Sequence, residues 1–444
     1  MWSIINYANE YINMNGYILT ILNIWSFFEL INWFVYLYMY LKIINPRLMH
    51  YQEKDTEKII KRVDKLSRKE IEYIIKGCIK YDKINHQKID QKTFDIKDLS
   101  RKEMIYLLNH SLFGLEDDKI TDIEQFTKIN NLLIKIENKL HHTFKNDDTN
   151  RYIYMYWGKN FINFNFRPLF LQLIIRVVMN IFHYYMIYNK KFSYWVCPKS
   201  KIAYLYKTID PTKKNLLFIH GFGFGYIPYF SRLKYLDTKF NLIIMILPNI
   251  SSYNYSDDIN SGLFPSNKII VDSFYNCANK MKITELNILS HSFGTFITQI
   301  ILNDSRNTFI KKTIMVDPII FWICCFKMST YIDQYPEQTD SIVTNMVELL
   351  INLTIYQCLY LRYICLRAMF GPDFWVYNAT ELEGKNILLV LEYDDHVVPS
   401  EFLYKKIKDC NLSYYYLSNA LHGSVLLDPK FEKVFKDIIE YYDT

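Results

Sequence analysis

Glycine is scarce in this 444-residue chain, which contains only 12 glycines. Three of them fall close together, at Gly221, Gly223 and Gly225. Since glycine lets the backbone approach a ligand closely, this concentration indicates a loop whose amides face a bound molecule, with a plain turn as the alternative. No Lys-Ser/Thr pair follows the loop, and its spacing is not that of a dinucleotide fingerprint. The pattern therefore argues against a phosphate-binding or nucleotide-binding loop.

The chain also lacks a strong charge of either sign and any regular spacing of cysteine. Its formal net charge is +6, which gives no indication of a nucleic-acid surface. The eight cysteines include no C-x-x-C pair, a pattern that indicates buried, reduced thiols and a reducing compartment. Neither the cysteines nor the ten histidines form a metal-binding pattern, so the sequence predicts no metal and no cofactor.

Lysine and arginine are absent from residues 1–16, and the most hydrophobic long run, Tyr17–Ile44, follows directly. This run has the length of a membrane span. Its polar residues include Asn23, Glu29 and Asn32. An ionised carboxylate near the middle of a bilayer costs about 2–3 kcal/mol. We predict a single-pass membrane anchor within residues 1–50, with an interfacial, hairpin or buried core helix as alternatives.

The flanks of this run predict its orientation. Six basic residues follow it between positions 42 and 62, whereas none precedes it within residues 1–16. The positive-inside rule then places the rest of the chain in the cytosol. A cleaved signal peptide is not expected, because the N-terminus has no basic region and no small-residue cleavage site follows the run.

Residues 51–203 form a helical connecting region in this prediction, with helix ends at Gly77 and Gly114. Within it, residues 168–188 are apolar but contain Arg176 and His183, seven positions apart on one helix face. This spacing favours an amphipathic helix lying on a membrane or under the next domain. A second span is the alternative, and it would move the C-terminal domain to the other side.

Residues 204–444 change to short apolar runs separated by helical segments, which predicts an α/β domain with a mostly parallel sheet covered by helices. Two helices are expected, over Lys268–Met281 and from about Lys430. The expected strands are 216–219, 242–247, 286–289, 313–316, 387–391 and 414–417. Catalytic groups should then gather at the carboxyl ends of these strands.

The stretch Asn287–Phe296 has the pattern of a strand that turns abruptly into a helix, with Ser292 at the corner. Such a nucleophile elbow needs small residues two positions before and after the serine, and Ser290 and Gly294 meet that need. The amide of Phe293 would then lie at a helix start, where unpaired N–H groups can face an oxyanion. An ordinary strand end is the alternative.

The glycine-rich loop follows another predicted strand and reads His220-Gly221-Phe222-Gly223. At the carboxyl end of that strand, the amide of Phe222 would supply a second oxyanion donor.

An acid is expected after the strand at 387–391, where a carboxylate can accept the ring N–H of a histidine. We select Asp395, which precedes Pro399 by four positions. Asp394 is the alternative, and Asp317 is a weaker one, because Asp-Pro is a common way to leave a strand.

A histidine that could act as general base follows the last predicted strand. His422 lies 27 residues after Asp395, with one helix and one strand between them. His291 and His396 compete less well, because one points away from the elbow and the other lies beside the acid.

The oxyanion loop, serine, acid and histidine follow one another in that order along the chain. In this order, residues from about 205 to 440 resemble the α/β-hydrolase superfamily. The motifs are HGFGFG, SHSFG, DHVVP and LHG. A vaguer similarity to membrane-anchored eukaryotic members with a helical N-terminal region rests on Arg167-Pro168-Leu169 and Phe374-Trp375. Ser290 and Glu392 depart from the pattern, since glycine is usual at both positions.

The resemblance implies a cap over the site, which we place at about residues 319–383, an apolar insertion. The sequence therefore predicts a membrane-associated serine hydrolase that cleaves a hydrophobic or lipid ester through a Ser292-His422-Asp395 triad. The alternatives are an acyltransferase with the same triad and a non-catalytic α/β-hydrolase fold that binds or scaffolds. The sequence predicts no nucleic-acid partner and indicates no oligomeric state.

Overall fold

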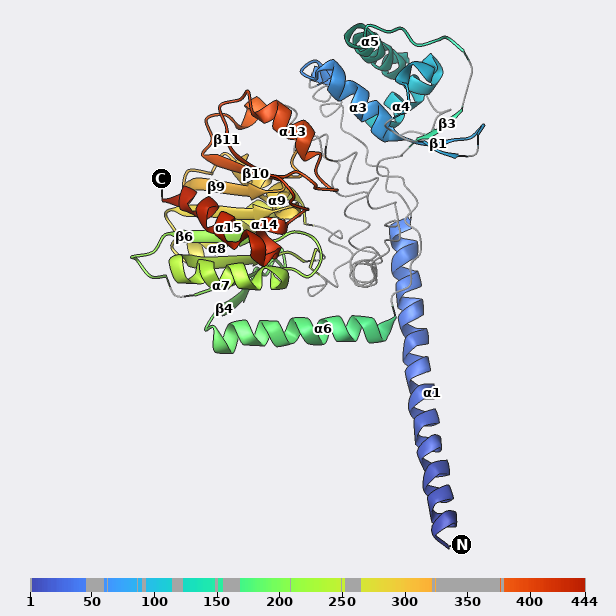
Figure 1. Ribbon diagram of the computed structural model, residues 1–444, viewed down its shortest axis with the longest axis vertical. Helices are drawn as coiled ribbons and strands as arrows, with labels where there is room; N and C mark the ends of the chain where they lie inside the picture. Colours follow the sequence, from blue (N-terminus) through green and yellow to red (C-terminus); the bar gives the residue numbers. More distant parts are fainter. Residues whose placement is uncertain are drawn as a thin grey trace.

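The computed structural model (Figure 1) describes most of the chain outside the predicted cap. The described residues are 2–44, 60–61, 63–85, 87–89, 93–113, 123–147, 151–154, 168–207, 209–248, 250–251, 265–321, 324, 376 and 379–443. The predicted cap therefore lies almost wholly outside the described residues, as do Arg167, Phe374 and Trp375.

An eight-stranded sheet forms the centre of the C-terminal domain, in the order β11-β10-β9-β8-β6-β7-β5-β4. Its strands are β4 (Ser193–Val196), β5 (Ala203–Tyr206), β6 (Asn215–Ile219), β7 (Asn241–Ile246), β8 (Leu286–His291), β9 (Ile310–Val316), β10 (Ile387–Glu392) and β11 (Ser413–Leu417). Seven of the strands run in the same direction, and β5 runs in the opposite one. This confirms the expected fold class, and all six predicted strands are present. The strands β4 and β5 were not predicted from the sequence.

Helices cover both faces of this sheet and so bury its central strands on both sides. The helices are α7 (Phe230–Lys239), α8 (Asn267–Lys280), α9 (Phe293–Leu302), α13 (Ser400–Ile407), α14 (Ser424–Leu427) and α15 (Glu432–Ile439). One core cluster joins α8, α9 and α13 to the sheet, and a second joins α7, α14 and α15 to the opposite face. Short 3-10 turns lie at Ile227–Tyr229, Ala379–Leu382, Pro429–Phe431 and Glu440–Tyr442.

The region expected to be a helical connecting region contains short strands as well as helices. The helices α3 (Arg68–Cys78), α4 (Arg101–Phe113) and α5 (Ile123–Leu140), with a 3-10 turn at Ile96–Asp98, lie beside a three-stranded antiparallel sheet, β2-β1-β3. Its strands are β1 (Ile79–Asp82), β2 (Gln87–Lys88) and β3 (Tyr152–Tyr154). These strands are too short to show the alternation of polar and apolar residues by which a strand is recognised in a sequence. The buried Asp82 carboxylate ties β1 to β3 through an ion pair of 2.6 Å with Arg151.

Two apolar helices lie at a large angle to each other, α1 (Trp2–Ile44) and α6 (Leu169–Tyr184), which continues as a π-helical turn over Tyr185–Asn189 (Figure 1). The segments Thr20–Leu41 and Leu169–Asn189 are long and apolar enough to cross a membrane. The N–H of Leu169 donates to both carboxylate oxygens of Glu29, at 3.0 and 2.9 Å. This contact fixes the start of α6 against the middle of α1.

Candidate active site

The turn between β8 and α9 holds Ser292 in a backbone conformation that non-glycine residues rarely adopt. Its φ is 50° and its ψ is −119°, a costly conformation that only a well-packed surrounding can maintain. A Cβ on Gly294 would lie 2.3 Å from the carbonyl oxygen of Ile219 at the end of β6, so the close contact between the turn and β6 admits only glycine there. Ser290, in contrast, is accommodated inside the sheet, and its hydroxyl donates to the carbonyl of Ile314 at 3.5 Å.

Three predicted side chains from separate loops come together at the carboxyl ends of the strands. The Oγ of Ser292 lies 2.9 Å from Nε2 of His422, and Nδ1 of His422 lies 2.7 Å from Oδ2 of Asp395. The other carboxylate oxygen of Asp395 accepts the N–H groups of Val397 and Val398, at 2.6 and 2.8 Å. These bonds fix both ends of a continuous chain from carboxylate to hydroxyl.

The two acids that the sequence left open for this position differ in environment. Burial would raise the pKa of Asp395, but the His422 ring and the two amides outweigh it and hold that pKa below its usual range. Asp394 and His396, its neighbours in sequence, are exposed. The structure therefore brings Asp395 to His422, and leaves Asp394 and His396 outside this set of contacts.

The residues whose amides are the two expected oxyanion donors contact each other. Phe293 is the first residue of α9, and the first N–H groups of a helix point away from its body. The rings of Phe222 and Phe293 are in contact, with centroids 4.4 Å apart. A Cβ on Gly221 would lie 3.1 Å from the Cβ of Ser292, so glycine lets this loop approach the serine.

His220 holds the loop in place from within the core. Burial lowers its pKa to about 4, so the ring is neutral. Its Nε2 accepts the N–H of Leu247 at 3.3 Å, which leaves Nδ1 to donate to the carbonyl of Gly221 at 2.7 Å. Gly223 has a φ of 111°, which favours glycine, and its N–H donates to the carbonyl of Ile250. Glycine at this position is therefore needed for the backbone conformation of the loop.

Two further buried carboxyl groups hold the loop that carries the histidine. Asp317, at the end of β9, accepts the N–H of Gly423 at 2.6 Å. Glu392, at the end of β10, accepts the N–H groups of Ser424 and Val425, at 2.8 and 2.6 Å. The sequence showed Glu392 only as a departure from a family pattern. An acid at the end of an otherwise apolar strand was the available signal.

These two carboxyl groups are harder to ionise than ordinary ones. Burial, followed by the charge of the neighbouring Asp317, raises the pKa of Glu392 to about 9. Burial and the charge of Asp395 raise the pKa of Asp317 to about 7. At neutral pH Glu392 is therefore protonated and can donate to Asp317, which limits the repulsion between the acids.

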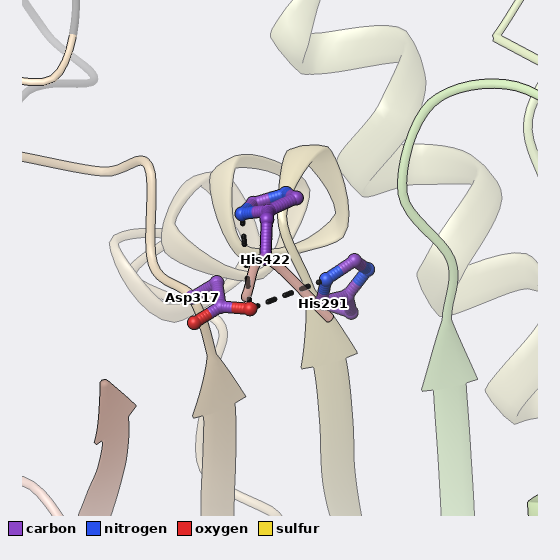
Figure 2. Close-up of side chains that lie close together, drawn as sticks. All are labelled: His291, Asp317 and His422. Carbon is purple, nitrogen blue, oxygen red and sulfur yellow. Dashed lines mark ion pairs between the residues drawn. The ribbon is translucent and has the colours of Figure 1, made fainter. Parts of the chain in front are cut away.

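Figure 2 shows His291 and Asp317 at the ends of neighbouring strands, with His422 beside them. Asp317 Oδ2 lies 3.6 Å from Nε2 of His291 and 3.7 Å from Nδ1 of His422. These three groups could together hold a metal ion. Shorter hydrogen bonds to Asp395 and Gly423 already use the same His422 and Asp317 atoms. We therefore assign the cluster to orienting His422.

The charges around His422 determine when it can accept a proton. Burial would lower its pKa, but Asp395, followed by Asp317 and Glu392, raises it to about 9. His291 behaves in the opposite way, since burial and the His422 charge hold its pKa well below the usual range. Its Nδ1 lies 2.8 Å from the hydroxyl of Tyr229, so it is a neutral neighbour of the site.

A serine at a strand-to-helix turn of a mostly parallel sheet, followed by an acid and a histidine after later strands, defines the α/β-hydrolase fold. This chain has that fold. No protein-family model and no curated protein matches the sequence.

Several solved structures are similar to part of the chain. A carboxylesterase from Bacillus subtilis is 10% identical, with a TM-score of 0.42, over 62% of this chain and 99% of that one. An alpha/beta hydrolase from a deep-sea metagenome is 14% identical, with a TM-score of 0.45, over 57% and 98%. A membrane phospholipase A, described as a bacterial virulence factor, is 13% identical, with a TM-score of 0.40, over 62% and 98%. Such distant similarity carries no information about the substrate.

Proposed function

We propose that the protein is a membrane-associated serine hydrolase that cleaves a hydrophobic carboxylic ester. The observation that carries this proposal is the continuous hydrogen-bonded chain from Asp395 through His422 to Ser292, with distances of 2.7 and 2.9 Å. Each atom in it has the position that a nucleophile, its base and the orienting acid require.

The reaction follows from these positions. His422 Nε2 removes the proton from Ser292 as the serine oxygen bonds to the ester carbonyl carbon, and the carbonyl oxygen becomes an oxyanion facing the Phe222 and Phe293 amides. His422 then gives the proton to the leaving alcohol as its C–O bond breaks. Water, deprotonated by His422, next attacks the acyl-enzyme and releases the acid and free Ser292. Asp395 stabilises the imidazolium in both steps.

A hydrophobic substrate fits the surroundings of the serine. The ring of Phe222 in the oxyanion loop packs on the ring of Phe293, the residue after the serine. The two apolar helices α1 and α6 favour attachment to a membrane, through a single pass of α1 with the α/β domain on the cytosolic side.

A fluorophosphonate probe, which labels activated serines, tests the proposal directly. The full-length protein should be labelled, and Ser292→Ala should remove the label and lower ester turnover by roughly 10⁴-fold or more. Ser290→Ala is the matched control, because it changes a buried serine two positions away and should leave labelling in place. Equal labelling of Ser292→Ala and the native protein would remove Ser292 from the mechanism.

A further inference from the structure

The helix α6 has an apolar face that the rest of the described chain leaves exposed. Its opposite face is buried against the α/β domain. For example, the ring of His183 contacts Tyr194 of β4, with centroids 4.6 Å apart, and Phe182 contacts Phe230 of α7 at 5.8 Å. The exposed face consists of Phe170, Leu173, Ile174, Val177, Val178, Ile181, Tyr184, Tyr185 and Tyr188. A continuous apolar stripe of this kind marks an interaction surface.

The position of α1 indicates what covers this stripe. In Figure 1 the α/β domain and the module of α3, α4 and α5 lie on one side of α6, and among the described residues only the N-terminal part of α1 extends on the other side. The stripe faces that side, because the opposite face of α6 packs on the α/β domain. The part of α1 that extends there includes Tyr17–Phe28, whose described large apolar side chains are mostly exposed.

We propose that the surface of a lipid bilayer runs along the exposed stripe of α6, so that α6 lies in the plane of the membrane and α1 enters the membrane beyond Glu29. The part of α1 that precedes Glu29, Trp2–Phe28, is about 40 Å long at 1.5 Å per residue, which is enough for the single pass across a hydrocarbon core about 30 Å thick.

This arrangement accounts for the polar residues inside the apolar run of α1. Glu29 accepts the N–H of Leu169, and Asn32 accepts from Gln172 at 3.2 Å. Both contacts lie at the level of α6, hence at the membrane surface. The first turn of α6 would otherwise leave N–H groups without partners next to lipid.

The charges on α6 fit a surface of anionic lipids. From Leu169 to Lys191 the sequence has three basic residues and no acidic one. Arg176 is exposed, and Lys190 and Lys191 follow the end of the helix. A long basic side chain can lay its stem on the apolar region while its head reaches a phosphate group.

The same arrangement places the candidate site close to the lipid. The terminal methyl of Met179, on the buried face of α6, would lie 3.8 Å from a Cβ built on Gly225. Gly225 closes the loop that carries Phe222. The loop that carries Phe222 therefore ends against α6. This inference rests on the membrane attachment proposed above and not on the hydrolysis.

Photo-crosslinking of the full-length protein in phosphatidylcholine–phosphatidylserine vesicles tests the inference. A benzophenone amino acid is placed singly at position 181 on the stripe, at 182 on the buried side, at 21 in α1, or at 123 in α5. The replaced Ile181 and Ile123 are both exposed, by 61% and 85%, which makes position 123 the matched control. We expect lipid adducts from positions 181 and 21, and none from 182 or 123.

Each other outcome overturns a definite part of the proposal. Adducts from 21 but not from 181 would contradict the in-plane helix and leave the membrane attachment intact. Adducts from both 181 and 182 would mean that lipid surrounds α6, as in a span. Adducts from neither 21 nor 181 would contradict the attachment as well. Fluorophosphonate labelling of Ser292 in the same samples reports the proposed hydrolase separately and shows that each variant is folded.

Discussion

At the scale of single residues, the site depends on which carboxylate faces His422. Asp395 accepts from the histidine and from two backbone amides, whereas Asp394 is exposed. The sequence could narrow the acid to this pair, because both follow a buried strand. It could not choose between them on physical grounds, since the direction of a side chain in a turn depends on contacts far along the chain.

Exchanging each of these acids for its amide should separate their roles. Asp395→Asn should lower turnover by roughly 10⁴-fold, because an amide cannot hold the histidine in the required tautomer or stabilise its charged form. Asp394→Asn is the matched control and should stay within about twofold of the native rate, as surface changes usually do. Steady-state kinetics with a soluble ester measures both. A larger loss in Asp394→Asn would reverse the assignment.

Asp317 should influence the pH dependence of the reaction. His422 must be neutral to take the serine proton, and its raised pKa, about 9, means that the rate increases as pH rises towards alkaline values. Asp317→Asn removes a charge 3.7 Å from Nδ1 and so lowers the pKa of His422. The rising limb of kcat/KM against pH should then move to lower pH.

The amide oxygen can still accept from Gly423, so the loop should be retained in this variant. A limb that stays in place, or moves to higher pH, would show that Asp317 does not act on His422 through its charge.

At the scale of elements, the turn between β8 and α9 depends on close contact with β6. In Gly294→Ala the new methyl would meet the carbonyl of Ile219, and backbone cannot yield there without moving Ser292. We expect a loss of stability of about 1–3 kcal/mol, typical of overpacking, together with loss of fluorophosphonate labelling.

Gly384→Ala is the control for this prediction. Gly384 has a φ of 76° but open space around its Cβ direction, so the substitution costs backbone strain only. It should destabilise the protein slightly and leave labelling unchanged, as thermal unfolding and gel fluorescence can show. Equal behaviour of the two variants would mean that the tight contact at Gly294 is not what holds the turn.

Strands marked by a local sequence pattern could be predicted, whereas strands that depend on pairing between distant segments could not. The six parallel strands are short apolar runs beside turn residues, so each could be recognised alone. In contrast, β4 lies just after an apolar helix, and β1 pairs with β3 some 70 residues later. The roles of Asp317 and Glu392 were also hidden, because both depend on backbone N–H groups brought near them by folding.

At the scale of the whole molecule, the side of the membrane that carries the α/β domain can be tested. Since basic residues follow the apolar run Tyr17–Ile44 and none precedes it within residues 1–16, we expect the domain on the cytosolic side. Protease added to sealed vesicles with the cytosolic face outward should digest residues 204–444 without detergent. Immunoblotting against a C-terminal tag measures this, and a lumenal marker protein reports the seal. Protection of the tag would reverse the orientation and leave the triad unaffected.

The bond between Glu29 and Leu169 also has a consequence for biosynthesis. Its two partners are 140 positions apart in the chain. At translation rates of about 5–20 residues per second, Glu29 is made roughly 7–28 s before Leu169. In the membrane attachment that we propose, α1 would start that interval without its later partner. The depth at which α1 first inserts would then be provisional, and the arrival of α6 would fix it.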